Sequence, residues 1–222
     1  MLDTHYACRE DPHSISWTKR RMVPGQCKST WCRHSTSKKN DQKGPDVAES
    51  PESQGRQDDD SGPVQGFLTS DEIVSMASKL NVPVEIIMRD QITKPKLNMT
   101  YVLNLDTSGN PGTHWVMYRR MGKSNENRGS IFYFDPFGRP PPNELVKFGP
   151  ITYSDDQVQD PESSHCGYFV MLVAYWLNES LMSNLSSNDA LQAVEKSLNE
   201  TFERPLINND AIVRDTLRLL QL

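Results

Sequence analysis

One cysteine lies where its thiol could act as a nucleophile. Cys166 follows the polar loop 159–165 and precedes an apolar run, residues 168–177, that is typical of a buried helix. A helix N-terminus presents unpaired N–H groups and a partial positive charge, which stabilise a thiolate and can hold a developing oxyanion. Gly167 places no side chain beside the sulfur, so a substrate backbone could approach. The alternative is a buried cysteine that only packs against its neighbours.

A histidine and an aspartate are spaced so that they could serve this thiol. His114 follows the turn 110–113 and begins a predicted strand, and Asp135 ends another predicted strand just before Pro136. If the two strands are neighbours, the carboxylate lies at the same rim of the sheet as the imidazole. There it can orient the ring and stabilise its protonated form. Taken singly, each is an ordinary loop or turn residue, but together with Cys166 they predict a thiol protease.

Three segments that contain these residues resemble the adenain-like and Ulp-like cysteine proteases. They read GTHWV at 112–116, YFDPFG at 133–138 and QDPESSHCG at 159–167. Their order is most similar to that of the adenoviral maturation proteases and their relatives encoded by Maverick/Polinton elements and large DNA viruses. The resemblance covers about residues 68–178. It implies a papain-like or adenain-like α+β fold, in which a central mixed sheet packs on a buried helix that carries the nucleophile at its N-terminus.

The resemblance implies a role for each catalytic residue. Cys166 matches the nucleophile, His114 the general base and Asp135 the residue that orients the histidine. Gln159 matches the side chain that donates to the oxyanion, a role that suits an amide N–H. Gln157 competes for this assignment, and Gln159 is preferred because its separation from the cysteine resembles the spacing in adenain.

The same resemblance implies the surroundings of the site. Trp115 and Gly167 are expected to bind substrate, with the indole beside the imidazole where it limits water; a purely structural core tryptophan is the alternative. Neither a metal nor an organic cofactor is expected. Disulfide-linked activation like that of adenain is not expected, because Cys166 is the only cysteine after residue 32. Nucleic acid is not expected as a partner except as an alternative activator. The protein is expected to act as a monomer.

The elements that must position these residues can be read from the hydrophobic pattern. Thr69 and Ser70 precede acidic residues and an apolar series with helical spacing, which predicts a helix that ends before Pro83. Short apolar runs bounded by turn residues predict five strands, and two amphipathic segments predict closing helices. The strands are expected at 84–88, 101–105, 115–118, 131–134 and 151–153, and the closing helices at 189–198 and 210–220. Strands bracketed by helices indicate an α+β protein.

Composition divides the 222 residues into a tail and one domain. Residues 34–66 contain no Phe, Trp, Tyr, Ile, Leu or Met, so they cannot bury enough apolar surface to fold. We therefore expect a disordered polar tail at 1–66 and a protease domain at 67–222. Cys8, Cys27, Cys32 and His34 could form a zinc site, but their spacing fits no standard finger, and an unstructured tail is favoured.

Charge and hydropathy narrow the class of protein further. The net charge of −5 provides no overall basic field, which argues against a dedicated DNA-binding protein. The mean hydropathy is −0.65, and no apolar run is long enough to cross a membrane. The N-terminal residues carry acidic side chains instead of a signal core. We therefore expect no membrane partner and an intracellular location, in the nucleus or the cytoplasm.

These inferences leave one leading function and two alternatives. The leading one is an endopeptidase that processes precursor proteins of a virus or mobile element. The first alternative is a Ulp-type enzyme that removes ubiquitin or SUMO from conjugates, because Ulp proteases share the fold and the catalytic residues. The second is a decayed mobile-element copy that folds but no longer cuts. The presence of all four catalytic residues argues against decay.

Overall fold

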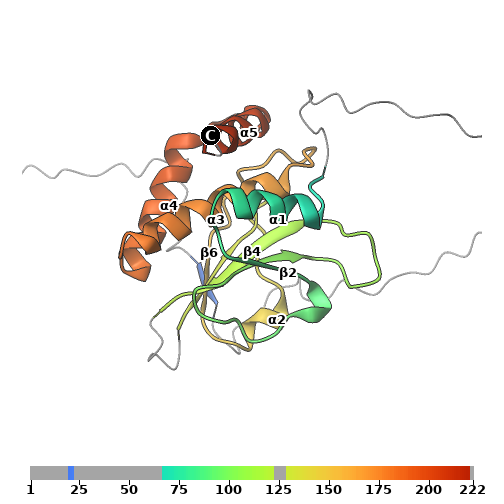
Figure 1. The fold of residues 1–222 in the computed structure, drawn as a ribbon, viewed down its shortest axis with the longest axis vertical. Helices are drawn as coiled ribbons and strands as arrows, with labels where there is room; N and C mark the ends of the chain where they lie inside the picture. The colour runs from blue at the N-terminus through green and yellow to red at the C-terminus, as the bar shows by residue number, and fades with distance from the viewer. Residues whose placement is uncertain (1–19, 23–66, 123–128, 221–222) are drawn as a thin grey trace, which may run out of the picture. The chain divides into compact units, whose positions relative to one another are not determined.

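The computed structural model describes residues 20–22, 67–122 and 129–220, which all belong to one compact unit. In these residues six strands form a single sheet in the order β1-β6-β5-β4-β3-β2 (Figure 1). The strands are β1 (Arg20–Met22), β2 (Val84–Met88), β3 (Thr100–Asn104), β4 (Trp115–Arg120), β5 (Ile131–Phe134) and β6 (Ile151–Tyr153).

The pairing of the strands brings two distant parts of the sequence to one end of the sheet. β4 is antiparallel to both β3 and β5, whereas β2 is parallel to β3 and β6 is parallel to β5, so the sheet is mixed. Met117 of β4 lies opposite Phe134 of β5. Because the two strands are antiparallel, the start of β4 and the end of β5 lie at the same end of the strands. His114 and Asp135 are the residues just outside those two ends.

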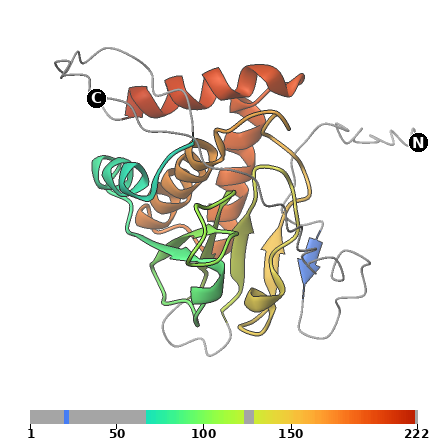
Figure 2. The same cartoon turned by 90° about the vertical axis from the view of Figure 1, so that its right-hand side faces the viewer.

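The helices pack mainly on one face of the sheet. They are α1 (Ser70–Lys79), α2 (Asn143–Val146), α3 (Cys166–Met182), α4 (Ser187–Thr201) and α5 (Asn209–Leu220), with 3-10 turns η2 (Arg89–Gln91) and η3 (Leu206–Asn208). α3 contacts β4 and is itself contacted by α1, α4 and α5. Figure 2 shows these helices stacked over the sheet. In the described ranges no helix is both long and apolar enough to cross a bilayer.

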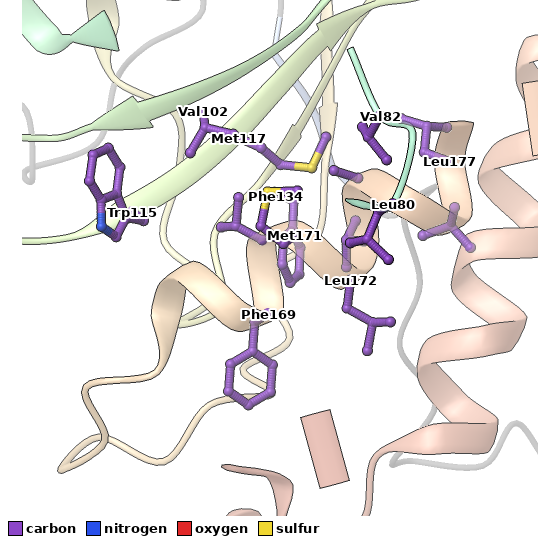
Figure 3. Packing of buried hydrophobic residues seen from close by; sticks show 14 of the residues in the cluster. Leu80, Val82, Val102, Trp115, Met117, Phe134, Phe169, Met171, Leu172 and Leu177 are labelled. Carbon is purple, nitrogen blue, oxygen red and sulfur yellow. The ribbon is translucent and has the colours of Figure 1, made fainter. Parts of the chain in front are cut away.

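The core follows the two-residue period of the strands. Val102, Met117 and Phe134 face α3 and join its side chains in one hydrophobic cluster (Figure 3). Their sequence neighbours, among them Leu103 and Tyr133, belong to a second cluster. Residues on all sides of α3 are buried, as expected for a helix that is apolar all round. Cys166 at its first position is therefore fixed by the core.

The structure confirms the α+β class with a mixed sheet, and most predicted elements. α1 begins where the sequence predicts, because Thr69 Oγ1 accepts the Glu72 N–H while the Glu72 carboxylate accepts the Thr69 N–H. β2 has the predicted bounds, and the other four predicted strands are each found within two residues of them. α3 begins at Cys166, α4 is a few residues longer than predicted, and α5 begins one residue earlier than predicted.

One strand differs from the sequence prediction. Residues 20–22, placed in the disordered tail, form β1 and pair antiparallel with the outer edge of β6. A three-residue edge strand depends on backbone hydrogen bonds to its neighbour and has too few residues to show a hydrophobic period. The rest of the predicted tail, residues 1–19 and 23–66, lies outside the described residues.

Candidate active site

His114 and Asp135 form a buried hydrogen-bonded pair. His114 Nε2 and Asp135 Oδ1 are 2.8 Å apart, and the two side chains are 8% and 0% exposed. Because a carboxylate can only accept, Nε2 is the donor. Oδ1 also accepts the backbone N–H of Phe137 at 2.8 Å, and the Phe137 ring stacks on the imidazole with 4.8 Å between centroids. Asp135 therefore holds one edge of the imidazole, and the Phe137 ring covers one of its faces.

Cys166 lies beside the segment that carries His114. It is the first residue of α3 and is 2% exposed. The backbone N–H of Trp115, the residue after His114, donates to Cys166 Sγ at 3.4 Å. The Cys166 side chain is close enough to His114 to contribute to the raised pKa of the imidazole. The structure thus brings together three residues that lie up to 52 positions apart in the sequence.

The electrostatics of the site favour a protonated imidazole. Burial lowers the pKa of His114, but hydrogen bonds to Asp135 and Cys166, together with the negative charges of both, raise it from 6.5 to about 9. At neutral pH the ring therefore carries a proton and a positive charge. A cation in this position can stabilise a nearby anion and holds a proton ready for a leaving group.

Gln157 and Gln159 form hydrogen bonds within the loop that precedes Cys166. Gln159 is fully buried, and its Nε2 donates to the carbonyl oxygen of Ser163 at 2.9 Å and to the Ser163 hydroxyl at 3.1 Å. Gln157 Nε2 donates to the Gln159 carbonyl oxygen at 2.7 Å. Gln159 Oε1 is buried and has no hydrogen-bond partner among the described residues. The oxyanion role of Gln159 stays a prediction, because both its amide bonds go to Ser163.

The N-terminus of α5 holds the same loop from the outside. Asp210 accepts the Ser163 hydroxyl at 2.8 Å and lies 3.1 Å from His165 Nδ1. Asn209 Nδ2 donates to the Val158 carbonyl oxygen at 2.8 Å. The sequence analysis missed these contacts. In the sequence, the one signal for these contacts is His165, which directly precedes the nucleophile and has no other assigned role. The NND run at 208–210 gives no such signal, because it is typical of an ordinary helix start.

The structure places Trp115 and Gly167 around a third residue, Leu68. The Trp115 indole N–H donates to the Leu68 carbonyl oxygen at 2.8 Å, and Trp115 is 6% exposed. A Cβ on Gly167 would lie 3.0 Å from Leu68 Cδ1. Leu68 therefore occupies the space beside Gly167 that was expected to be open. The substrate-binding role of Trp115 and Gly167 stays a prediction.

A cavity of about 340 Å³ opens beside the histidine. Its lining includes His114 and Trp115, the loop 110–113 and the exposed Phe67, which is 64% exposed. A peptide that lay in this cavity would pass next to the imidazole. Of the three residues, His114 lines this cavity, whereas Cys166 and Asp135 are not among its described lining residues.

The described part of the chain has no cluster of side chains that could bind a metal ion. No group of three or more His, Cys, Asp or Glu side chains in those ranges could hold an ion. The four residues weighed as a zinc site, Cys8, Cys27, Cys32 and His34, lie outside the described residues.

Comparison with known proteins gives a partial structural likeness. No family model and no curated protein matches the chain. Among solved structures, the chain is similar to the crystal structure of the ASFV pS273R protease, at 18% sequence identity and a TM-score of 0.29. The match covers 47% of this chain and 44% of that protease, so the chain spans less than half of its length. At this level of likeness, the assignment of function depends on the geometry of the site.

Proposed function

We propose that this protein is a cysteine peptidase with Cys166 as nucleophile, His114 as general acid and base, and Asp135 as the orienting carboxylate. One observation carries the proposal. His114 Nε2 forms a buried bond of 2.8 Å to Asp135, and the pKa of the same ring is raised by Asp135 and by the thiol at the start of α3. A purely structural cysteine has no need of a charged imidazole fixed by a carboxylate.

The mechanism follows from these positions. Cys166 Sγ attacks the carbonyl carbon of a peptide, a C–S bond forms, and the carbonyl electron pair moves to the oxygen. When the tetrahedral intermediate collapses, the C–N bond breaks and the leaving amine takes the proton held by His114. His114 then removes a proton from water, which attacks the thioester and releases the acid and the thiolate. Asp135 keeps the ring in the required tautomer throughout.

The oxyanion is assigned to two donors. The first is the backbone N–H of Cys166, the first residue of α3. The second is Gln159, whose amide must release one of its two bonds to Ser163 before it can donate to the oxyanion. Gln159→Ala should lower kcat by about 10²-fold and leave substrate binding nearly unchanged. Gln157→Ala is the matched control, and a large loss there with none at Gln159 would reverse the assignment.

The substrate class is a protein precursor cut within the chain. The cavity beside His114 is open along the loop 110–113 and has an exposed aromatic ring, Phe67, at its lining, which suits an extended peptide. The resemblance of the three sequence segments to maturation proteases favours the precursors of a virus-like element as substrates. Removal of ubiquitin-like tails is the alternative that the same chemistry permits.

The deciding experiment is terminal-peptide mass spectrometry on a protein extract treated with the purified protein. Cys166→Ala is the control, because it removes only the sulfur. New N-termini inside proteins, with a shared sequence around the cut and absent from the control, support the endopeptidase. Release confined to ubiquitin-like tails assigns the deconjugating activity instead. Equal cleavage by both proteins refutes a role for Cys166 in peptide hydrolysis.

A further inference from the structure

A buried arginine lies far from the proposed active site without a charged partner. Arg119, in β4, is 4% exposed. Its Nη1 donates to Thr100 Oγ1 at 3.1 Å and to Asn178 Oδ1 at 3.3 Å, and both acceptors are neutral. Within residues 67–122 and 129–220 no carboxylate forms an ion pair with it. A buried cation is ordinarily paired, because its removal from water is costly.

Arg119 lines a cavity, and part of its guanidinium has no hydrogen-bond partner among the described residues. A space of about 620 Å³ is lined by Arg119 and Asn178 together with side chains from α1, the end of α3 and the loops at residues 81–83 and 98. Nε and Nη2 of Arg119 make no hydrogen bond to the described residues. A guanidinium has five N–H donors, so most of its capacity is open to a ligand in the cavity.

The cavity is remote from the nucleophile. Asn178 and Cys166 lie on the same helix, α3, and are twelve positions apart. At 1.5 Å per residue this separation is about 18 Å along the helix axis. Arg119 is likewise near the end of β4, whereas His114 precedes its start. A ligand in this cavity would therefore occupy a site distinct from the peptidase centre.

The lining of the cavity indicates the chemistry of the ligand. Among the described residues that line the cavity, Arg119 is the only charged one, which fits one negative charge and not the two of a phosphate monoester. The planar fork of arginine matches a carboxylate with two parallel hydrogen bonds. Val82, Pro83 and the exposed Met182 add apolar surface, while Asn81 and Asn98 add polar groups. We propose that this cavity binds a carboxylate attached to an apolar body, with Arg119 as its counterion.

Binding can be tested with small probes by isothermal titration calorimetry of the full chain at constant ionic strength. N-acetyl-leucine carries the carboxylate of a peptide C-terminus, and hexanoate carries that of a fatty acid. N-acetyl-leucinamide has the same body as the first probe without the charge. Either carboxylate should bind at least about tenfold more tightly than the amide, because the charge-assisted bond is lost with the charge. The tighter carboxylate identifies the kind of apolar body.

Two variants tie the binding to Arg119. Arg119→Met keeps the apolar stem and should weaken carboxylate binding about tenfold or more, whereas Arg218→Met removes an exposed arginine of α5 and should leave it unchanged. Asn178→Asp places a carboxylate of the protein itself 3.3 Å from Nη1. It should therefore exclude the probes, and this test remains available even if Arg119→Met fails to fold.

Three outcomes would overturn the proposal. The first is that neither carboxylate binds the unmodified protein more tightly than N-acetyl-leucinamide. The second is that Asn178→Asp binds the carboxylates as well as the unmodified protein does. The third is that inorganic phosphate binds more tightly than both carboxylates, which would assign a different class of anion. None of these readouts depends on peptidase activity, so the test stands apart from the function proposed above.

Discussion

Replacing Asp135 with Asn tests the electrostatic basis of the proposed site. Oδ1 carries both hydrogen bonds of this carboxylate, to His114 Nε2 and to the Phe137 N–H, and Oδ2 has no partner among the described residues. An asparagine can keep both bonds through its own Oδ1 and place its amide nitrogen at the position of Oδ2. The substitution therefore removes the charge with little change of shape.

The expected size of the effect follows from the pKa of His114. With a pKa of about 9 the ring is about 97% protonated at pH 7.5, and with the ordinary value of 6.5 it would be about 9% protonated. Because the charge of Asp135 raises this pKa, Asp135→Asn should lower the pKa toward the ordinary value of 6.5. The supply of imidazolium at pH 7.5 should thus fall by up to about tenfold, and the rate of peptide hydrolysis with it.

The assay is an NMR titration of the histidine ring protons, in which the signal of His114 is assigned by its loss in His114→Ala. The unmodified protein should titrate near pH 9 and Asp135→Asn up to about two pH units lower. Asp215→Asn is the control, because it removes the charge of an exposed carboxylate on α5. A change of less than about half a unit in Asp135→Asn would refute the assignment of Asp135 as the group that holds the imidazolium.

Three further predictions concern stability. The pKa of His114 is higher in the folded than in the unfolded chain, so its stabilisation is fully present below pH 6.5 and lost as pH rises through about 9. In urea unfolding, the difference in free energy of unfolding between the unmodified protein and His114→Ala should shrink by up to about 3 kcal/mol across that window. A difference that grows with pH would contradict the prediction. Trp115→Phe leaves the buried Leu68 carbonyl oxygen without its donor and should lower the free energy of unfolding by about 1–3 kcal/mol, an expectation that an unchanged urea midpoint would exclude. Gly167→Ala should also destabilise, although alanine favours helices, because its Cβ would lie 3.0 Å from Leu68 Cδ1; a raised thermal midpoint would show that Leu68 moves freely.

Much of the fold could be predicted because its signals are local. The strand at 84–88 is a short apolar run bounded by Pro83, and α1 begins at a capping box that four consecutive residues define. The position of Cys166 at the start of α3 follows from the abrupt change between a polar loop and an apolar run. In each case the residues that decide the element are neighbours in the chain.

Other features could not be predicted because they depend on partners far away in the sequence. β1 exists only through its pairing with β6, and three residues carry no period that would reveal it. The space beside Gly167 is filled by Leu68, which lies 99 positions earlier. The amide of Gln159 donates to Ser163, four residues away, in an irregular loop whose course α5 fixes from outside. No local pattern encodes such contacts.

The candidate site shows the division between sequence and tertiary structure. The residue order alone specifies which residue types stand at the ends of which elements: a thiol at a helix start, a histidine before one strand and an aspartate after another. The packing of the chain makes β4 and β5 antiparallel neighbours, so that two separate strand ends carry one buried pair. Packing also raises the pKa of His114 and leaves Arg119 without an ion pair among the described residues. The physical reason is that helix and strand signals arise from adjacent residues, whereas burial and electrostatic partners are set by which distant surfaces pack together.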